Sequence, residues 1–438
     1  MKKTVVALAL LVGFSVAIVS CGSKSSSSNQ HKASGLAFRA FVSNSLFPSG
    51  AVTAPVLNIV DATKDVLSPS LVSLLSVASQ AQLMAVSNDL HLSMVFSPSS
   101  NSIAVVDNTT EAIATAAGST SNLPAIGLPG PTQSMFIAND NITAYVAVPS
   151  APVTGQAQGA VLQISLGTGA ITATVPVPAA HYIVPTPDGT NILVFSDNSD
   201  FITIVAIGLI GSSQDPRTII SGTPTNHFDR PVWAIFTGNS TAEIFNCGPE
   251  CGGTAAGVAP FTVGSLAPGA TVAVSGATYG LIVGNTLYVA GTPPNTPCGP
   301  GTAATACGTL NMINVSSMTL INSKPIIIPD GYHDRMAMGA NGQLFVGSHT
   351  CTSINVLGGE VRGCLAIFNT NTSQVIVPPR TGDATGIQPI PGRTVVYTCE
   401  GGAFGIYDTT TDQILIQPIM IDIVGQSYDV KLVDPPPN

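Results

Sequence analysis

An apolar run of similar character returns eight times along the 438-residue chain. Each copy is a short stretch of bulky apolar residues that ends in small or polar ones. The copies begin at Phe41, Val95, Val146, Val194, Ile244, Tyr288, Phe345 and Val396. Their spacing of 44 to 57 residues is typical of β-propellers and related arrays. The repeat therefore predicts one repetitive domain rather than several unrelated ones.

Further strands are expected around each run. Ahead of most lies an apolar stretch that ends in a turn, such as residues 182–189. After each comes a strand that often ends in an acid and threonines, such as residues 103–110, and a fourth segment such as 413–420 completes the unit. Four antiparallel strands in about fifty residues make one propeller blade. The chain is thus predicted to be an all-β propeller of eight four-stranded blades.

The two ends of the repeat region predict how the ring closes. The first unit starts at the second strand of a blade, near Phe38, with no first strand before it. The chain continues past the last unit to a further strand over residues 427–433. That C-terminal strand can complete the first blade and remove an exposed sheet edge.

The repeats resemble the YVTN family of β-propeller repeats, which occur in exported bacterial proteins. The resemblance is carried by Phe41-Val42-Ser43-Asn44 and by the later turns at Val106-Asp107 and Tyr407-Asp408, each followed by threonines. It covers residues 36–434 and implies a propeller in an exported protein. Seven blades are commoner in that family, so seven is the alternative to eight. A fold of this kind does not define an activity.

The composition excludes one class of partner. Only 8% of the residues are charged, against about 25% in typical soluble domains. Residues 1–20 hold two of the 14 basic residues and no acids, so the remaining chain has 12 basic and 23 acidic residues and a net charge of −11. Scattered basic residues on an acidic chain offer no stripe for nucleic acid, and we expect no nucleic-acid partner.

The N-terminus has the pattern of a secretory signal peptide. Lys2 and Lys3 precede an apolar run over residues 4–19, which is short for a bilayer-spanning helix. We expect residues 1–20 to be removed on export.

The cleavage region, residues 18–21, resembles a bacterial lipobox. By that resemblance Cys21 is lipidated and anchors the protein to the membrane, residues 21–35 form a flexible Ser-rich tether, and residues 36–438 form the propeller domain. The alternative is ordinary cleavage that leaves a stray cysteine. Gly22 stands where Asp would signal retention at the inner membrane, so the resemblance points to the outer membrane, at its periplasmic face or at the cell surface.

Seven cysteines follow Cys21, all at or next to one face of the predicted ring. We call it the top face; it carries the loops between blades and the loops between the second and third strands of each blade. Three close pairs in an exported protein predict disulfides. The predicted pairs are Cys247–Cys251, Cys298–Cys307 and Cys351–Cys364, and Cys399 is left over.

A zinc or other soft-metal site is the alternative use of these cysteines. None of the spacings is the two-residue type of a zinc knuckle, which favours disulfides. No Cys-x-x-Cys-His segment occurs, which argues against covalent haem. We expect no cofactor.

Charged side chains gather on the same face. A histidine followed closely by Asp-Arg precedes two equivalent blades, the fifth and the seventh. With the only tryptophan and one further arginine, the candidate binding set is His227, Asp229, Arg230, Trp233, His333, Asp334, Arg335 and Arg362. Other polar residues at top-loop positions are His181, Asp197, Asp200, Glu250, His349, Glu360 and Glu400.

This set has two interpretations. Arginines suit a carboxylate or phosphate, and the histidines and acids suit proton transfer. The alternative is that the same pairs satisfy structural hydrogen bonds between blades.

Three functions are compatible with the sequence. We expect a non-catalytic binding or scaffold lipoprotein whose top face engages a protein, a glycan or a small anion. The main alternative is a lactonase-like hydrolase built on the two His-Asp-Arg clusters. A third is a redox or metal-handling role of the cysteines. Because no nucleophile elbow, Walker loop or His-Glu-x-x-His motif occurs, no catalytic residue is assigned.

Overall fold

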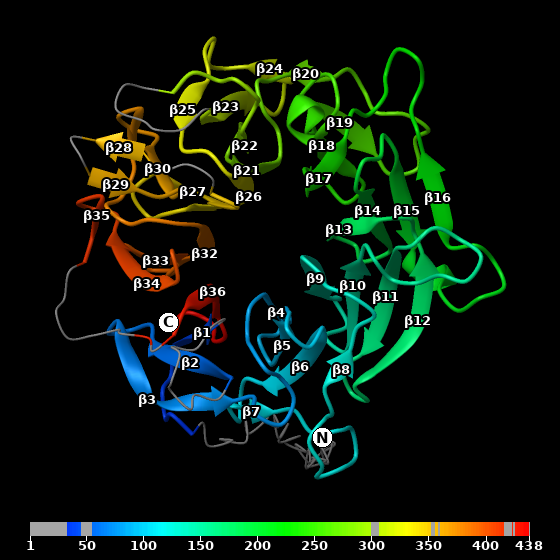
Figure 1. Ribbon diagram of the computed structural model, residues 1–438, viewed down its shortest axis with the longest axis vertical. Coiled ribbons are helices and arrows are strands. Elements are labelled where there is room, and N and C mark those ends of the chain that lie inside the picture. The colour runs from blue at the N-terminus through cyan, green and yellow to red at the C-terminus, as the bar shows by residue number, and fades with distance from the viewer. Residues whose placement is uncertain are drawn as a thin grey trace, which may run out of the picture.

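The computed structural model describes residues 33–437 apart from 45–54, 299–305, 352–354, 358–359, 416–422 and 424. The predicted lipidation site, Cys21, lies outside the described residues. Eight antiparallel sheets form a ring, which confirms the predicted all-β propeller and its eight blades rather than seven (Figure 1). In the part of the chain that is described, no helix is long and apolar enough to cross a membrane.

Each blade runs from the ring axis outward, and we number the blades 1 to 8 from the one that contains β1 (Figure 1). From blade 1 to blade 8, the innermost strands are β36 (Ser427–Leu432), β4 (Met84–Val86), β9 (Ser134–Ile137), β13 (Ala180–Pro185), β17 (Pro231–Phe236), β21 (Tyr279–Val283), β26 (Tyr332–Met338) and β32 (Ala384–Pro389). The second strands are β1 (Arg39–Asn44), β5 (Leu92–Ser97), β10 (Thr143–Val148), β14 (Asn191–Ser196), β18 (Thr241–Asn246), β22 (Thr286–Gly291), β27 (Gln343–His349) and β33 (Val395–Glu400).

The outer half of each blade follows the same order. The third strands are β2 (Val56–Asp61), β6 (Ser102–Asp107), β11 (Ala160–Ser165), β15 (Ile202–Ala206), β19 (Gly257–Thr262), β23 (Gly308–Asn314), β30 (Ala366–Asn369) and β34 (Ala403–Asp408). The outermost strands are β3 (Val66–Ser73), β7 (Ala112–Ile113), β12 (Ala170–Pro176), β16 (Arg217–Ile220), β20 (Val272–Ala273), β24 (Thr319–Leu320), β31 (Gln374–Ile376) and β35 (Gln413–Ile414).

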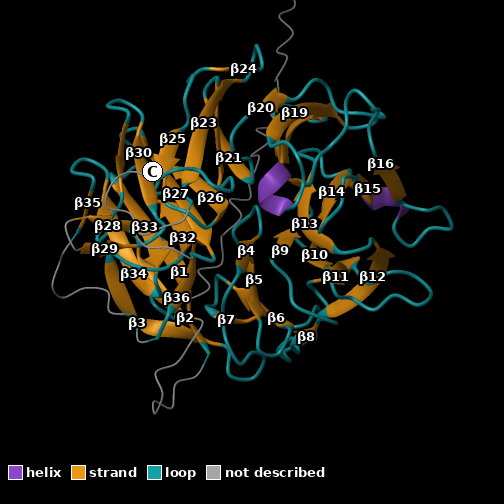
Figure 2. Cartoon of the chain, turned by 45° about the horizontal axis from the view of Figure 1, so that its top comes forward, coloured by secondary structure: helices purple, strands orange, loops and turns teal. Residues whose placement is uncertain are grey.

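A few short elements lie outside this scheme. The additional strands are β8 (Ile126–Gly127) on β6, β25 (Ile326–Ile328) on β23, and the hairpin of β28 (Asn355–Leu357) and β29 (Glu360–Arg362). Two single turns of 3-10 helix are the only helical segments among the described residues, η1 (Ile207–Leu209) and η2 (Gly248–Cys251) (Figure 2).

The eight repeated runs of the sequence are the second strands of the blades. Every residue of β1 and of β33 is buried, and in β5 and β10 only the first residue is partly exposed. A strand covered on both faces by neighbouring blades carries a continuous apolar run instead of an alternating one. The repeat is visible in the sequence for that reason.

The apolar core lies between adjacent blades instead of forming one central mass. One cluster joins blades 2 and 3 through residues such as Phe96 and Leu162. Another joins blades 8 and 1 through residues such as Tyr397 and Val42. Since each blade buries its faces against its two neighbours, all eight blades are covered only when the ring closes.

The C-terminal strand β36 closes the ring, as the sequence predicts, by pairing with β1 as the innermost strand of blade 1. Next to it the buried Arg39 donates hydrogen bonds of 2.7 and 2.8 Å to Asp434 and one of 2.6 Å to Glu111 in blade 2. Glu111 also accepts the backbone N–H of Ser34 at 2.6 Å. The two ends of the domain are therefore fastened to each other and to blade 2.

Five innermost strands are irregular at the end nearest the top face, and one of them, β36, shifts against β1 between Val42 and Asn44. The register of β13, β17, β26 and β32 against the adjacent second strand shifts by one residue, at His181, Val232, Asp334 and Thr385. Such a β-bulge leaves one extra residue in a strand and re-aims the side chains around it. As a result, consecutive residues such as His181 and Tyr182 both line the cavity described next.

Candidate functional site

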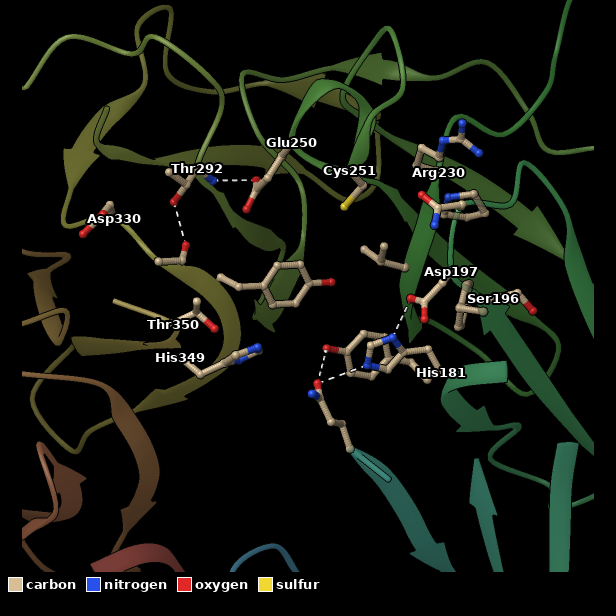
Figure 3. A pocket seen from close by; sticks show the side chains of 18 of the residues that line it. His181, Ser196, Asp197, Arg230, Glu250, Cys251, Thr292, Asp330, His349 and Thr350 are labelled. Atoms are coloured by element: carbon tan, nitrogen blue, oxygen red, sulfur yellow. Dashed lines mark hydrogen bonds and ion pairs between the residues drawn. The ribbon is translucent and has the colours of Figure 1, made fainter. Parts of the chain in front are cut away.

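A cavity of about 700 Å³ opens on the top face between blades 4, 5, 6 and 7. Figure 3 shows His181 and Asp197 on one side of it, Glu250 and Thr292 on a second side, and His349 with Thr350 on a third. Cavities of about 300 to 1,000 Å³ are the usual size of small-molecule sites. The cavity is large enough for an organic ligand.

Aromatic rings from four successive blades form a layer that we call the aromatic floor: Tyr182, Trp233, Tyr279 and Tyr332. Tyr182 and Tyr332 both line the cavity and stack with centroids 6.3 Å apart and planes within 6°. They belong to blades 4 and 7, which are not neighbours, so the pair spans the centre of the ring. Trp233 lies 6.1 Å from Tyr182 and 5.1 Å from Tyr279, centroid to centroid. Burial raises the pKa of all three tyrosines, so their hydroxyls stay protonated and neutral.

One wall of the cavity is a fixed hydrogen-bonded group. His181 Nδ1 lies 2.5 Å from Asp197 Oδ1, and His181 Nε2 lies 3.1 Å from Gln133 Oε1. The Tyr182 hydroxyl donates to the same Gln133 oxygen at 3.2 Å, and the His181 ring stacks on Tyr182 at 4.3 Å. Both ring nitrogens of His181 are occupied, so the histidine is held in one orientation.

A second wall presents a carboxyl group with little solvation. Glu250 lies in the η2 turn, which the Cys247–Cys251 disulfide closes. Its Oε2 accepts the backbone N–H of Thr292 at 2.6 Å, and Oε1 has no hydrogen-bond partner among the described residues. Burial raises the pKa of Glu250 to about 7.

An ion pair positions the histidine of the third wall. The bulge residue Asp334 accepts hydrogen bonds from Arg335 at 3.0 and 3.2 Å, and lies 3.0 Å from Nδ1 of His349. Burial alone would raise the pKa of Asp334, but Arg335 and His349 outweigh it and lower the pKa to about 2. The ionised carboxylate orients His349, whose ring lines the cavity (Figure 3).

Four of the eight predicted site residues belong to this region. Arg230 lines the cavity, and Trp233 is part of the aromatic floor. Asp334 and Arg335 position His349. The Asp and Arg of the second His-Asp-Arg cluster therefore support a residue that lines the cavity.

The other four do not line the cavity. His227 is exposed, and His333 is fully buried, where burial lowers its pKa to about 4. Asp229 accepts backbone N–H groups of residues 254–255 at 2.8 to 3.0 Å. Arg362 donates a hydrogen bond to the carbonyl of Val377. These contacts favour the structural interpretation for Asp229 and His333.

Part of the site was not predicted from the sequence. His181, Asp197, Glu250 and His349 were expected on the top face but lay outside the candidate set, and the tyrosines of the aromatic floor were not among the candidates. One signal was available: blades 4 to 7 each have an aromatic residue within the first three positions of the innermost strand. Nothing in the sequence shows that these rings meet.

The three predicted disulfides are present, with Cα–Cα distances of 5.7, 5.2 and 6.0 Å for Cys247–Cys251, Cys298–Cys307 and Cys351–Cys364. Cys399 is free and buried, and burial raises its pKa to about 12. Within the described part of the chain, one group could hold a metal ion, Asp330 with Cys351 and Cys364. Since those two cysteines form a disulfide, they offer no thiolate ligands.

Fold and site together define a β-propeller with a top-face cavity of small-molecule size. No family model matches the chain, and no curated protein matches it. Among solved structures, the chain is similar to the dihydro-heme d1 dehydrogenase NirN in complex with DHE, with 10% identity, a TM-score of 0.58, and coverage of 91% of this chain and 75% of that one.

A second similar structure is apo AztD from Citrobacter koseri, with 11% identity, a TM-score of 0.51, and coverage of 90% of this chain and 97% of that one. A third is the periplasmic gluconolactonase PpgL of Pseudomonas aeruginosa, with 13% identity, a TM-score of 0.46, and coverage of 90% and 98%. At these identities the likeness shows the propeller fold alone.

Proposed function

We propose that the protein is a binding protein of the bacterial cell envelope that holds a small organic ligand in the top-face cavity. The observation that carries this proposal is the cavity itself, which combines an aromatic floor with a few fixed polar groups. Apolar lining with a small number of oriented polar groups is the usual build of a ligand site. The rigid ring presets this shape before a ligand arrives, which lowers the entropic cost of binding.

The location in the cell envelope is supported by three features. The N-terminal sequence fits a lipoprotein signal with Cys21 as the lipidated residue, and the repeats resemble the YVTN family of exported proteins. Three disulfides suit an oxidising compartment. We accordingly propose a lipid anchor in the outer membrane, with the domain at its periplasmic face or at the cell surface.

Binding is favoured over catalysis because the expected hydrolytic residues are not assembled. His227 and His333 lie away from the cavity, and Asp229 is engaged with backbone N–H groups. His181, which does line the cavity, has both ring nitrogens occupied.

A hydrolase remains the second candidate because of His349. Its Nδ1 contacts Asp334, and Arg335 fixes that carboxylate, an arrangement in which the other ring nitrogen can act as a general base. If the protein hydrolyses lactones, His349→Asn should abolish the activity, whereas the exposed His227→Asn should leave it unchanged.

A thermal-shift screen tests the binding proposal, using the chain from Gly22 onward and a set of lactones, sugars, amines and organic anions. A ligand at one hundred times its Kd stabilises the native state by about 2.7 kcal/mol, which raises Tm measurably. We expect the shift to disappear in Ser196→Phe, because the larger side chain fills part of the cavity from its rim. The shift should persist in Asp188→Asn, because Asp188 lies in a turn on the opposite face. Absence of any stabilising ligand, or a shift that Ser196→Phe leaves intact, would contradict the proposal.

A further inference from the structure

The charged groups at the cavity are mostly acidic. Asp197, Glu250 and Asp330 line it, and Arg230 is the one arginine or lysine among its described lining residues. The guanidinium of Arg230 forms a long ion pair, 3.7 Å from Asp200 Oδ1, and the backbone N–H of Arg230 donates to the same oxygen at 3.1 Å. The cavity thus has little positive charge available for a ligand.

The arginine below the cavity is paired as well. Arg335 donates two hydrogen bonds to Asp334 and a third to the carbonyl of Thr385. Replacing these partners with an anionic ligand would leave Asp334 buried without its cation, which is costly. The anionic ligand expected from the sequence would therefore compete with Asp334 for Arg335 and with Asp200 for Arg230.

Glu250 is the side chain that most lacks a counter-charge. It receives one backbone N–H and no cation among the described residues, and it lies on the opposite side of the cavity from Asp197 (Figure 3). A half-buried carboxylate of this kind gains most from a partner that brings both charge and hydrogen-bond donors.

The aromatic groups favour the same charge. The rings of Tyr182, Tyr332, His181 and His349 line the cavity near these carboxylates. The faces of tyrosine rings attract cations that lie within about 6 Å of the ring centre. Carboxylates at the wall and tyrosines at the floor form a common environment for an ammonium or guanidinium group.

We propose that the top-face cavity selects an organic ammonium ion, whose charged group lies between Glu250 and Asp197 and beside Tyr332. The inference rests on the proposed ligand-binding function and specifies its ligand class. A bare metal ion fits less well, because the one close group of potential ligands among the described residues contains two disulfide sulfurs.

Calorimetric titration of the chain from Gly22 onward tests this selection with matched probes. Choline and spermidine supply quaternary and primary ammonium groups, 3,3-dimethyl-1-butanol is the neutral isostere of choline, and gluconate is the anion. We expect an ammonium probe to bind at least about tenfold more tightly than the neutral isostere or gluconate.

Charge-removing variants locate the site. Glu250→Gln and Asp197→Asn each keep the side-chain shape and should weaken ammonium binding by about tenfold or more. Asp188→Asn removes one carboxylate from the opposite face and should leave the affinity unchanged. Thermal melting of each variant in the absence of ligand shows whether it is folded. Because Glu250→Gln and Asp197→Asn are independent, the test still works if one of them does not fold.

The outcomes separate this inference from the proposed function. If the neutral isostere or gluconate binds as tightly as the ammonium probes, and Ser196→Phe abolishes that binding, the cavity is a ligand site but the selection for cations is wrong. The selection for cations is also wrong if Glu250→Gln and Asp197→Asn both retain full affinity for a probe whose binding Ser196→Phe abolishes. If no probe binds and the wider thermal-shift screen also finds no ligand, both the proposed function and the inference fail.

Discussion

Carboxyl groups of the same chemistry behave in opposite ways in this protein, according to their partners. Asp334 has an arginine and a histidine beside it, and its pKa falls to about 2. Glu400, at the end of β33, is 1% exposed and accepts a hydrogen bond from the Tyr407 hydroxyl at 3.3 Å. Burial raises its pKa to about 8, although Arg380, the Tyr407 hydroxyl and the backbone N–H of Leu365 act in the opposite direction.

Glu400→Gln should stabilise the protein at alkaline pH. The pKa of Glu400 is about 8 in the folded state and about 4.3 when unfolded, so the folded state retains a proton that the unfolded state releases. Stability is therefore lost as the pH rises from about 4.3 to about 8. The neutral amide avoids this loss, which is at most about 5 kcal/mol because each pKa unit corresponds to about 1.4 kcal/mol.

Thermal melting of both proteins at pH 5 and pH 9 measures this effect. We expect nearly equal Tm values at pH 5 and a clearly higher Tm for Glu400→Gln at pH 9. An equal difference at both pH values would show that Glu400 does not carry this pH dependence.

Among the loops and strands, bulges and disulfides shape the cavity. The bulges at His181 and Asp334 bring consecutive side chains of an innermost strand to the cavity region. The Cys247–Cys251 disulfide closes the turn that carries Glu250, and Cys251 itself lines the cavity. The disulfide and the strand bulges thus position different side chains around the same cavity.

Thiol counting checks the disulfide arrangement in the chain from Gly22 onward, which has seven cysteines. The native protein should show no reactive thiol, because Cys399 is buried and its pKa is raised to about 12. Unfolding without a reductant should expose one thiol, and reduction should expose seven. Three or more thiols before reduction would be inconsistent with the three disulfides.

Much of the element-level structure is predictable from the sequence for physical reasons. The second strands are buried on both faces, so their apolar runs recur at a fixed period. The closing strand was predictable because the first blade lacks an innermost strand. Close cysteine pairs, in a chain whose N-terminus predicts export, identified all three disulfides.

The site was less predictable because it depends on contacts between distant blades. Tyr182 and Tyr332 are 150 residues apart, and they meet only because blades 4 and 7 face each other across the ring. The bulges are set by the pairing of two strands, which no single segment encodes. The role of an Asp-Arg pair depends on its neighbours in space. Asp229 accepts loop backbone N–H groups, whereas Asp334 contacts His349 at the cavity.

The candidate site and the closing strand lie on different blades of the ring. The aromatic floor and the cavity lie on blades 4 to 7, whereas blades 8, 1 and 2 contain the closing strand and the buried Arg39–Asp434–Glu111 group. The closing strand and the candidate site thus lie on different arcs of the same ring. Arg335 links the two arcs, because it donates to the carbonyl of Thr385 in blade 8 and its charge interacts with Asp429 of the closing strand.

The position of Trp233 gives a direct test of the ligand site. It is the only tryptophan of the chain, and it packs against Tyr182 and Tyr279 in the aromatic floor. A ligand that raises Tm by occupying the cavity should also change the intensity or wavelength of Trp233 emission, and both signals should saturate with the same Kd. A ligand that stabilises the protein and leaves Trp233 emission unchanged at saturation would place the binding site elsewhere.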